Sequence, residues 1–248
     1  MATLCKKETM EEKLSGIVLG GVNFGENDKI LTIFTLEQGV ISARIKGVKK
    51  AGAKLKFASE PFCFASFIVA KKGKMRTVTG ASLIESFYPI REDLTRYFAG
   101  GTVLEYLKKF LQEGIVSADA FRLAVDTLKE IAYGDAPKYY LCDFLIKSLA
   151  FSGYALTLEG CYGCGCPCED RVFFDYAYGG FFCLECMTDG AKEINTDTYK
   201  ALKSIKEGVL VSEENCTKPL RLLDYYLTKK TEVTINSLKE LNKLFERA

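Results

Sequence analysis

CYGCGCPCEDRVFFDYAYGGFFCLEC, residues 161–186, contains two C-x2-C pairs, Cys161 with Cys164 and Cys183 with Cys186. Each pair forms a tight turn that can direct two thiolates at one metal ion, and the segment between the pairs is long enough to fold back as a hairpin. Four thiolates at this spacing suit tetrahedral zinc and disfavour magnesium or calcium. Because no coordination position is left for water, we expect one structural Zn²⁺ per chain.

Two further cysteines, Cys166 and Cys168, compete with Cys164 as ligands because they follow it closely. Cys161 and Cys164 are preferred because their spacing matches that of the second pair, and because Gly165 allows a sharp turn after the second ligand. A redox dithiol is the alternative to a metal site, although two matched pairs favour metal.

The composition is that of a folded globular protein, with 248 residues of which 48% are hydrophobic and 27% charged. This length allows one large domain or two to three small ones. No apolar run approaches the roughly 20 residues that span a bilayer, and the first residues lack the apolar core of a secretory signal. We therefore expect a cytoplasmic protein without membrane contact, whose ten cysteines are thiols and metal ligands rather than disulfides.

Histidine is absent from the chain. This excludes Ser-His-acid and Cys-His catalysis, mixed Cys/His zinc fingers and H-E-x-x-H proteases. The sequence also has no G-x-x-x-x-G-K-[ST] loop and no G-x-G-x-x-G motif. A nuclease needs several acids converging in space, whereas Glu92 and Asp93 are adjacent acids of the kind that mark a solvated helix start. We therefore expect no enzymatic activity.

Residues 14 to about 87 have the patterns of β-strands. Ile41, Ala43 and Ile45 alternate with polar residues, which is typical of a half-buried strand. A hairpin turn is predicted at residues 71–74. Five short strands predict a small barrel of the OB-fold type, with an SH3-like barrel as the alternative. We place this nucleic-acid-binding domain at residues 1–82.

After Pro89 the hydrophobic period changes to that of helices, which predicts a helical domain over residues 83–248. The fold class is therefore α+β multidomain: an N-terminal OB-fold β-barrel followed by an all-α helical domain with a zinc-binding insertion at 158–190. In the insertion, Tyr178-Gly179-Gly180 predicts a hairpin. Pro137 suits the first turn of a helix and Asn236 suits an N-cap. The expected helices are a first one after 94 that Gly100-Gly101 would kink or interrupt, then 118–133, 137–152, 195–206, 218–230 and 236–246.

The charge of the chain is unevenly distributed. Residues 1–80 hold 14 basic and 7 acidic residues, a net charge of +7, whereas the remainder holds 20 basic and 25 acidic residues, a net charge of −5. No acid lies between Gln38 and Ser59, where small residues separate the basic ones, so we expect a mobile loop that suits phosphate backbones. A solvated loop that only keeps the protein soluble is the alternative. The predicted nucleic-acid-binding residues are Arg44, Lys46, Lys49, Lys50, Lys54, Lys56, Lys71, Lys72 and Lys74.

Aromatic residues of the predicted barrel are candidates for stacking on bases. Because so small a domain must bury nearly all of its large apolar side chains, we expect most of them to be core residues. The candidates are Phe24, Phe34, Phe57, Phe62, Phe64 and Phe67.

Several segments carry a family resemblance. They are Gly16-Ile17-Val18-Leu19, Gly25-Glu26-Asn27-Asp28-Lys29-Ile30-Leu31-Thr32, Gly39-Val40-Ile41-Ser42-Ala43, Lys46-Gly47, Glu85-Ser86-Phe87 with Ile90-Arg91-Glu92-Asp93-Leu94, the two cysteine pairs with their glycines, and Lys218-Pro219-Leu220-Arg221. Through them the chain resembles, over essentially its whole length, the RecO family of bacterial recombination mediator and DNA repair proteins. Cys166 and Cys168 are a departure from the family pattern.

The resemblance implies an OB-fold, a helical domain and a zinc module. It also implies binding to single- and double-stranded DNA, annealing of complementary strands and help in loading the recombinase onto DNA coated by single-strand-binding protein. The implied partners are RecR and the acidic, apolar C-terminal tail of the single-strand-binding protein, and the protein would associate with the nucleoid when acting on DNA. The alternatives are a zinc-containing adaptor that binds only proteins, and an RNA-binding barrel protein.

Overall fold

The computed structural model describes residues 10–73 and 75–245. The chain divides into two compact units. The first ends at Phe87 and also includes Leu107–Arg122, and the second consists of Tyr88–Tyr106 and the residues from Leu123 onward. The predicted domain limits at 1–82 and 83–248 stay predictions.

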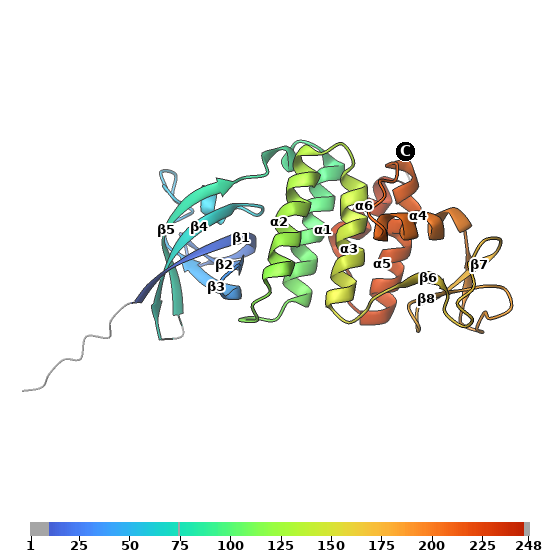
Figure 1. Ribbon diagram of the computed structural model, residues 1–248. Coiled ribbons are helices and arrows are strands. Elements are labelled where there is room, and N and C mark those ends of the chain that lie inside the picture. The colour runs from blue at the N-terminus through green and yellow to red at the C-terminus, as the bar shows by residue number, and fades with distance from the viewer. Residues whose placement is uncertain (1–9, 74, 246–248) are drawn as a thin grey trace, which may run out of the picture. The chain divides into compact units, whose positions relative to one another are not determined.

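The first unit contains a closed five-stranded barrel in the order β1-β2-β3-β5-β4 (Figure 1). β1 pairs antiparallel with both β2 and β4, and a short parallel pairing of β3 with β5 at Arg44–Thr77 and Ile45–Val78 completes the ring. The strands are β1 (Met10–Phe24), β2 (Asp28–Thr35), β3 (Gly39–Ile45), β4 (Phe64–Lys72) and β5 (Met75–Glu85). The predicted β-rich N-terminal part with five strands is therefore confirmed.

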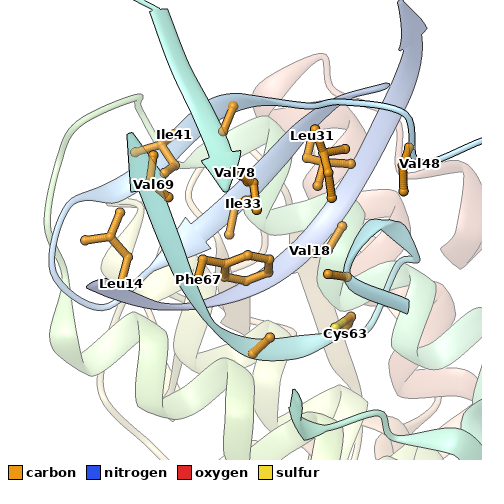
Figure 2. Close-up of a cluster of buried hydrophobic side chains, with 14 residues drawn as sticks. Leu14, Val18, Leu31, Ile33, Ile41, Val48, Cys63, Phe67, Val69 and Val78 are labelled. Atoms are coloured by element: carbon orange, nitrogen blue, oxygen red, sulfur yellow. The ribbon is translucent and has the colours of Figure 1, made fainter. Parts of the chain in front are cut away.

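The barrel interior is filled by the apolar side of each alternating strand. Ile41, Ala43 and Ile45 are buried while Ser42 between them is exposed, as the period-two pattern predicted. Figure 2 shows these inward side chains meeting in one cluster. Its largest members include Leu31, Ile33 and Phe67, all fully buried. Removing this apolar area from water is what holds the closed ring together.

The second unit is mainly helical, and the predicted helix boundaries agree with the structure to within about two residues. Among the described residues, no helix combines the length and the apolar character needed to cross a membrane. The helices are α1 (Leu94–Phe110), α2 (Ala118–Tyr133), α3 (Pro137–Phe151), α4 (Thr196–Lys206), α5 (Thr217–Thr231) and α6 (Asn236–Leu244), with the ends of α1 and α2 belonging to the first unit.

Two details of the helices differ from the prediction. α1 runs unbroken through Gly100-Gly101, so the predicted interruption is wrong, while the alternative of a kink stays a prediction. A Cβ at Gly101 would lie 3.0 Å from Ser237 Oγ, so the missing side chain makes room for α6. Asn236 is not the N-cap: α6 begins at Asn236, and the backbone N–H groups of Asn236 and Ser237 donate to the carboxylate of Glu105 at 3.0 and 2.9 Å. A carboxylate from another helix thus satisfies the first amides and complements the helix dipole.

A four-stranded sheet in the order β6-β8-β7-β9 covers the predicted insertion at 158–190 and extends beyond it, since β9 follows residue 190. β7 (Val172–Asp175) and β8 (Gly180–Phe182) form the predicted hairpin around Gly179, while β6 (Thr157–Cys161) pairs parallel to β8 and β9 (Lys192–Ile194) pairs with β7. The parallel pairing of β6 and β8 brings together the two chain segments that carry the cysteine pairs.

Replacing Phe67 by alanine should lower the free energy of unfolding of the barrel by about 3–5 kcal/mol, because a fully buried ring leaves a cavity in a closed core. Hydrogen exchange followed by mass spectrometry on the barrel strands measures this as lost protection. Ile68→Ala is the matched control, since Ile68 is the next residue on the outer face and is 42% exposed. Equal loss of protection in both variants would contradict this account of the core.

Candidate metal centre and nucleic-acid interface

The four predicted cysteine ligands converge in the structure. The Sγ atoms of Cys161, Cys164, Cys183 and Cys186 all lie within 4.8 Å of one another. In a zinc tetrathiolate with Zn–S bonds of 2.3 Å, tetrahedral geometry sets neighbouring sulfur atoms about 3.8 Å apart. The distance from Cys164 Sγ to Cys183 Sγ is 3.9 Å. Four sulfur donors at this separation fit a tetrahedral soft-metal site, and these are the residues that would hold zinc.

Backbone amides of the two turns stabilise negative charge in the cluster. Cys183 N–H donates to Cys161 Sγ at 3.4 Å. Burial alone would raise the pKa of Cys161, but the backbone N–H groups of Cys183, Cys164 and Gly163 outweigh it and lower that pKa to about 6. Hydrogen bonds with the Cys164 and Cys183 sulfurs raise the pKa of Cys186 to about 12. Cys186 therefore retains its proton in the metal-free cluster, and metal binding would release it.

Cys166 and Cys168 lie outside this group of four sulfurs. Cys166 is exposed and takes part through its backbone, since its carbonyl accepts a hydrogen bond of 2.8 Å from Cys161 N–H. Gly165 has a φ of +75°, the left-handed conformation predicted after the second ligand. Cys168 is buried, and this burial raises its pKa to about 11. The first turn thus directs Cys161 and Cys164, and not the two later cysteines, toward the second pair.

The predicted basic loop connects β3 to β4 and is folded into successive turns. Backbone hydrogen bonds run from Lys50 N–H to the Gly47 carbonyl at 3.2 Å and from Ala53 N–H to the Lys50 carbonyl at 3.1 Å. Val48 is buried in the barrel core and Leu55 packs against it, so apolar anchors hold the segment at two points. The exposed basic residues are Lys46, Lys49, Lys50, Lys54 and Lys56. The lysines therefore extend from a segment that is held in place by backbone hydrogen bonds and by two apolar contacts.

Arg44 has a different role from the lysines. Its Nε donates to Asp28 Oδ2 at 2.8 Å, and Gly47 N–H donates to Asp28 Oδ1 at 2.7 Å. The Gly47 amide and the Arg44 guanidinium hold the pKa of Asp28 below its usual value. Arg44 is thus an ion-paired residue at the base of the basic loop. The sequence did not indicate Asp28 as the ion-pair partner of Arg44, because that contact depends on the pairing of β2 with β3.

The hairpin between β4 and β5 carries Lys71 and Lys72, which are both exposed, while Lys74 lies outside the described residues. Most of the candidate stacking residues are core, as expected: Phe34, Phe62 and Phe67 are buried. Phe64 contacts the ring of Phe121, and Phe57 packs against the barrel core. Phe24 is the exception among the six, with 45% of the residue exposed.

The acidic pair considered for a nuclease marks a helix start. Asp93 Oδ1 accepts a hydrogen bond of 2.8 Å from Arg96 N–H at the beginning of α1. Glu92 is exposed. A capping role accounts for Asp93, and its carboxylate therefore has a structural partner.

Comparisons with known proteins agree over both parts of the chain. The family model described as "Recombination protein O N terminal" matches residues 10–87, and "Recombination protein O C terminal" matches residues 91–239. A DNA repair protein RecO of Acetivibrio thermocellus is 33% identical over 196 residues, which cover 78% of each chain. The protein of that name from Desulforamulus reducens is 30% identical over 90% of this chain and 92% of its own. That of Streptomyces coelicolor is 35% identical over 78% and 81% respectively.

Zinc content tests the metal centre directly. We expect about one Zn²⁺ per chain in protein purified without chelator, and replacing any of Cys161, Cys164, Cys183 or Cys186 by serine should lower it several-fold, because a three-sulfur site binds zinc less tightly. Cys166→Ser is the matched control, being exposed and outside the cluster. Elemental analysis by mass spectrometry gives the metal content. Absence of zinc from the unmodified protein, or its loss in Cys166→Ser, would refute the assignment.

Proposed function

The chain belongs to the RecO family of DNA repair proteins, and on this premise we propose that it is a non-enzymatic recombination mediator that binds DNA through its barrel. The family supports a role in DNA repair and recombination. The steps we assign are binding of single- and double-stranded DNA, annealing of complementary strands, and help in loading recombinase onto DNA coated by single-strand-binding protein. These steps act in the repair of gaps and breaks.

The basic loop on the closed barrel carries this proposal. The strand order β1-β2-β3-β5-β4 is that of an OB-fold, a barrel that uses the face of its second and third strands and the neighbouring loops to bind nucleic acid. Five exposed lysines follow directly after β3, with two more on the β4–β5 hairpin. Lysines act as point charges that contact phosphates without reading bases. Neutralising six phosphates would give a log–log salt slope of about −4 on single strands.

Annealing follows from the same charges. Two complementary strands repel each other through their phosphates, and a surface that neutralises phosphates of both strands lowers this repulsion. The bases stay free to pair because lysines hold the backbone rather than the base edges. The anchored turns of the loop keep the lysines in place without the cost of ordering an open chain on binding.

Zinc would have a structural role in this mediator. Four cysteine sulfurs leave no coordination position for water or substrate. When bound, the ion links the turn after β6 to the turn after β8. We propose that it stabilises the insertion in the helical part and takes no part in chemistry.

A pocket in the second unit suits the acidic, apolar tail of single-strand-binding protein. Its volume is about 410 Å³, and basic Lys138, Lys218 and Arg221 line it together with the ring of Phe245. Lys138 Nζ lies 4.2 Å from the Phe245 ring centroid. Two acids, Asp197 and Glu214, also line it, so cations outnumber anions by three to two. We propose this pocket for the tail; RecR is the other partner that the family relationship suggests.

Charge reversal of the loop tests the DNA-binding surface. Lys46, Lys49, Lys50 and Lys54 changed together to glutamate should abolish annealing of two complementary labelled oligonucleotides, because the phosphate contacts become repulsive. The matched control reverses Lys129, Lys200, Lys203 and Lys229, which are also exposed and lie in the helical part. The two variants have the same net charge, so a long-range charge effect would slow both equally.

The annealing assay is run across a salt series, with one strand coated by single-strand-binding protein. The expected result is that the unmodified protein accelerates annealing and that this acceleration fades as salt is raised. Of the two variants, only the loop variant should lose the acceleration. Acceleration that survives the loop reversal would refute the assigned surface. No acceleration by folded, zinc-loaded protein would instead favour an adaptor that binds only proteins.

Tail binding is tested separately with a fluorescent peptide that carries the acidic C-terminal residues of single-strand-binding protein. Lys138→Glu combined with Lys218→Glu should weaken peptide binding roughly tenfold or more, because like charges then face the tail. Lys129→Glu with Lys203→Glu is the control, since neither lysine lines the pocket. Fluorescence anisotropy gives both dissociation constants. Unchanged binding in the pocket variant would place the tail elsewhere.

A further inference from the structure

We propose that a single unstacked base of single-stranded DNA binds on Phe24, in a pocket on the outer face of the barrel. This inference rests on the proposed function and adds to it a site that distinguishes single strands from duplexes. The pocket has a volume of about 310 Å³. Its lining residues are Phe24, Ile30, Ser42, Ala43, Arg44, Met75 and Arg76.

Strand register places apolar groups on an outer face where polar residues are the rule. Ile30 pairs with Val22 on one side and with Arg44 on the other, so these three residues share a face. Phe24, two residues after Val22, lies on that face too. The neighbouring Leu31 points into the core instead. Val22 is 60% exposed and Met75 is 57% exposed, and apolar groups gathered in this way mark a binding surface.

Arg44 prepares the aromatic ring for stacking. Its guanidinium carbon lies 4.8 Å from the centroid of the Phe24 ring, and its Nε is held by Asp28 at 2.8 Å. The ring is thus supported by a cation that is itself fixed, while nearly half of Phe24 stays accessible. Every base has a π-face that can stack on such a ring, so the contact would be insensitive to sequence.

The pocket adjoins the basic loop through the turn between β1 and β2. Lys49 N–H donates to the Asn27 carbonyl at 3.0 Å, and Asn27 lies three residues after Phe24. Gly47 N–H is bound to Asp28, the same carboxylate that holds Arg44. A strand whose phosphates lie on the lysines can therefore present a base to Phe24. Charge complementarity and ring placement together favour nucleic acid over an apolar peptide as the occupant.

The pocket should select single strands. A volume of about 310 Å³ is at the small end for ligand sites, which suits one planar group. A base in a duplex is already stacked and paired, and extracting it costs several kcal/mol. The lysines therefore hold both forms of DNA, whereas Phe24 adds affinity for the single-stranded form alone.

Phe24→Trp gives a direct readout because the chain has no tryptophan of its own. Stacking of a base on the new indole would quench its fluorescence. We expect quenching by an oligothymidylate that is long enough to reach from the lysines of the loop to Phe24. A blunt duplex should cause none when it is added until the same fraction of protein is bound, as monitored by anisotropy. Quenching by neither ligand while both bind would overturn the pocket assignment. Equal quenching by both would overturn the proposed selectivity.

Phe24→Ala measures the contribution to affinity. Loss of one stacked base should weaken single-strand binding about 5- to 150-fold and leave duplex binding unchanged. Ile68→Ala is the control, since Ile68 is also apolar and exposed on the barrel. If the unmodified protein binds DNA and Phe24→Ala binds single strands equally well, the base pocket is wrong and the mediator function stands. If the unmodified protein binds no DNA, the proposed function fails first.

Discussion

The hydrogen-bonded carboxylate of Asp28 is the constraint on which the side of the barrel proposed to bind DNA depends. It lies at the start of β2 and binds Arg44 Nε at 2.8 Å near the end of β3, and Gly47 N–H at 2.7 Å in the following turn. The two donors lower the pKa of Asp28, with the Gly47 amide as the larger cause. Because Arg44 in turn lies on the Phe24 ring, one acid fixes the beginning of the basic loop and the support of the exposed aromatic residue. An acid within a basic domain thus organises the surface that is proposed to bind an anion.

Two kinds of contact are proposed for this surface, and they have different physical properties. Lysine–phosphate contacts weaken with salt and do not depend on base pairing. Stacking on Phe24 requires an unpaired base and depends little on salt. A protein that brings complementary strands together benefits from both, because it must hold single strands first and must not bind the finished duplex more tightly. The cysteine cluster serves a different purpose, since its four sulfurs can link the ends of β6 and β8 in a sheet whose strands are only three to five residues long.

Local patterns in the sequence predicted much of this arrangement. Alternation at Ile41, Ala43 and Ile45 marked a barrel strand, and matched spacing selected the four converging cysteines from six in the segment. Features that depend on partners distant in the chain could not be predicted. Glu105, which lies 131 residues before Asn236 in the sequence, caps α6. Asparagine is a good N-cap residue type, and for this reason the sequence wrongly indicated Asn236 as the cap. The pairing of Asp28 with Arg44 depends on the register of two strands. Phe24, the exposed one of the six candidate phenylalanines, could be told from the five buried or packed ones only once that register was known.

Photo-crosslinking tests the central claim, that DNA lies on the barrel around Phe24 and the basic loop, most directly. The full-length, zinc-loaded protein would be irradiated with a bound single-stranded oligothymidylate, and the crosslinked peptides identified by mass spectrometry. We expect crosslinks within residues 22–30 and 44–56, with the base attached at or next to Phe24 and with the crosslinks within 44–56 weakening as salt is raised. Crosslinks confined to the helices of the second unit, with none on the barrel, would contradict it.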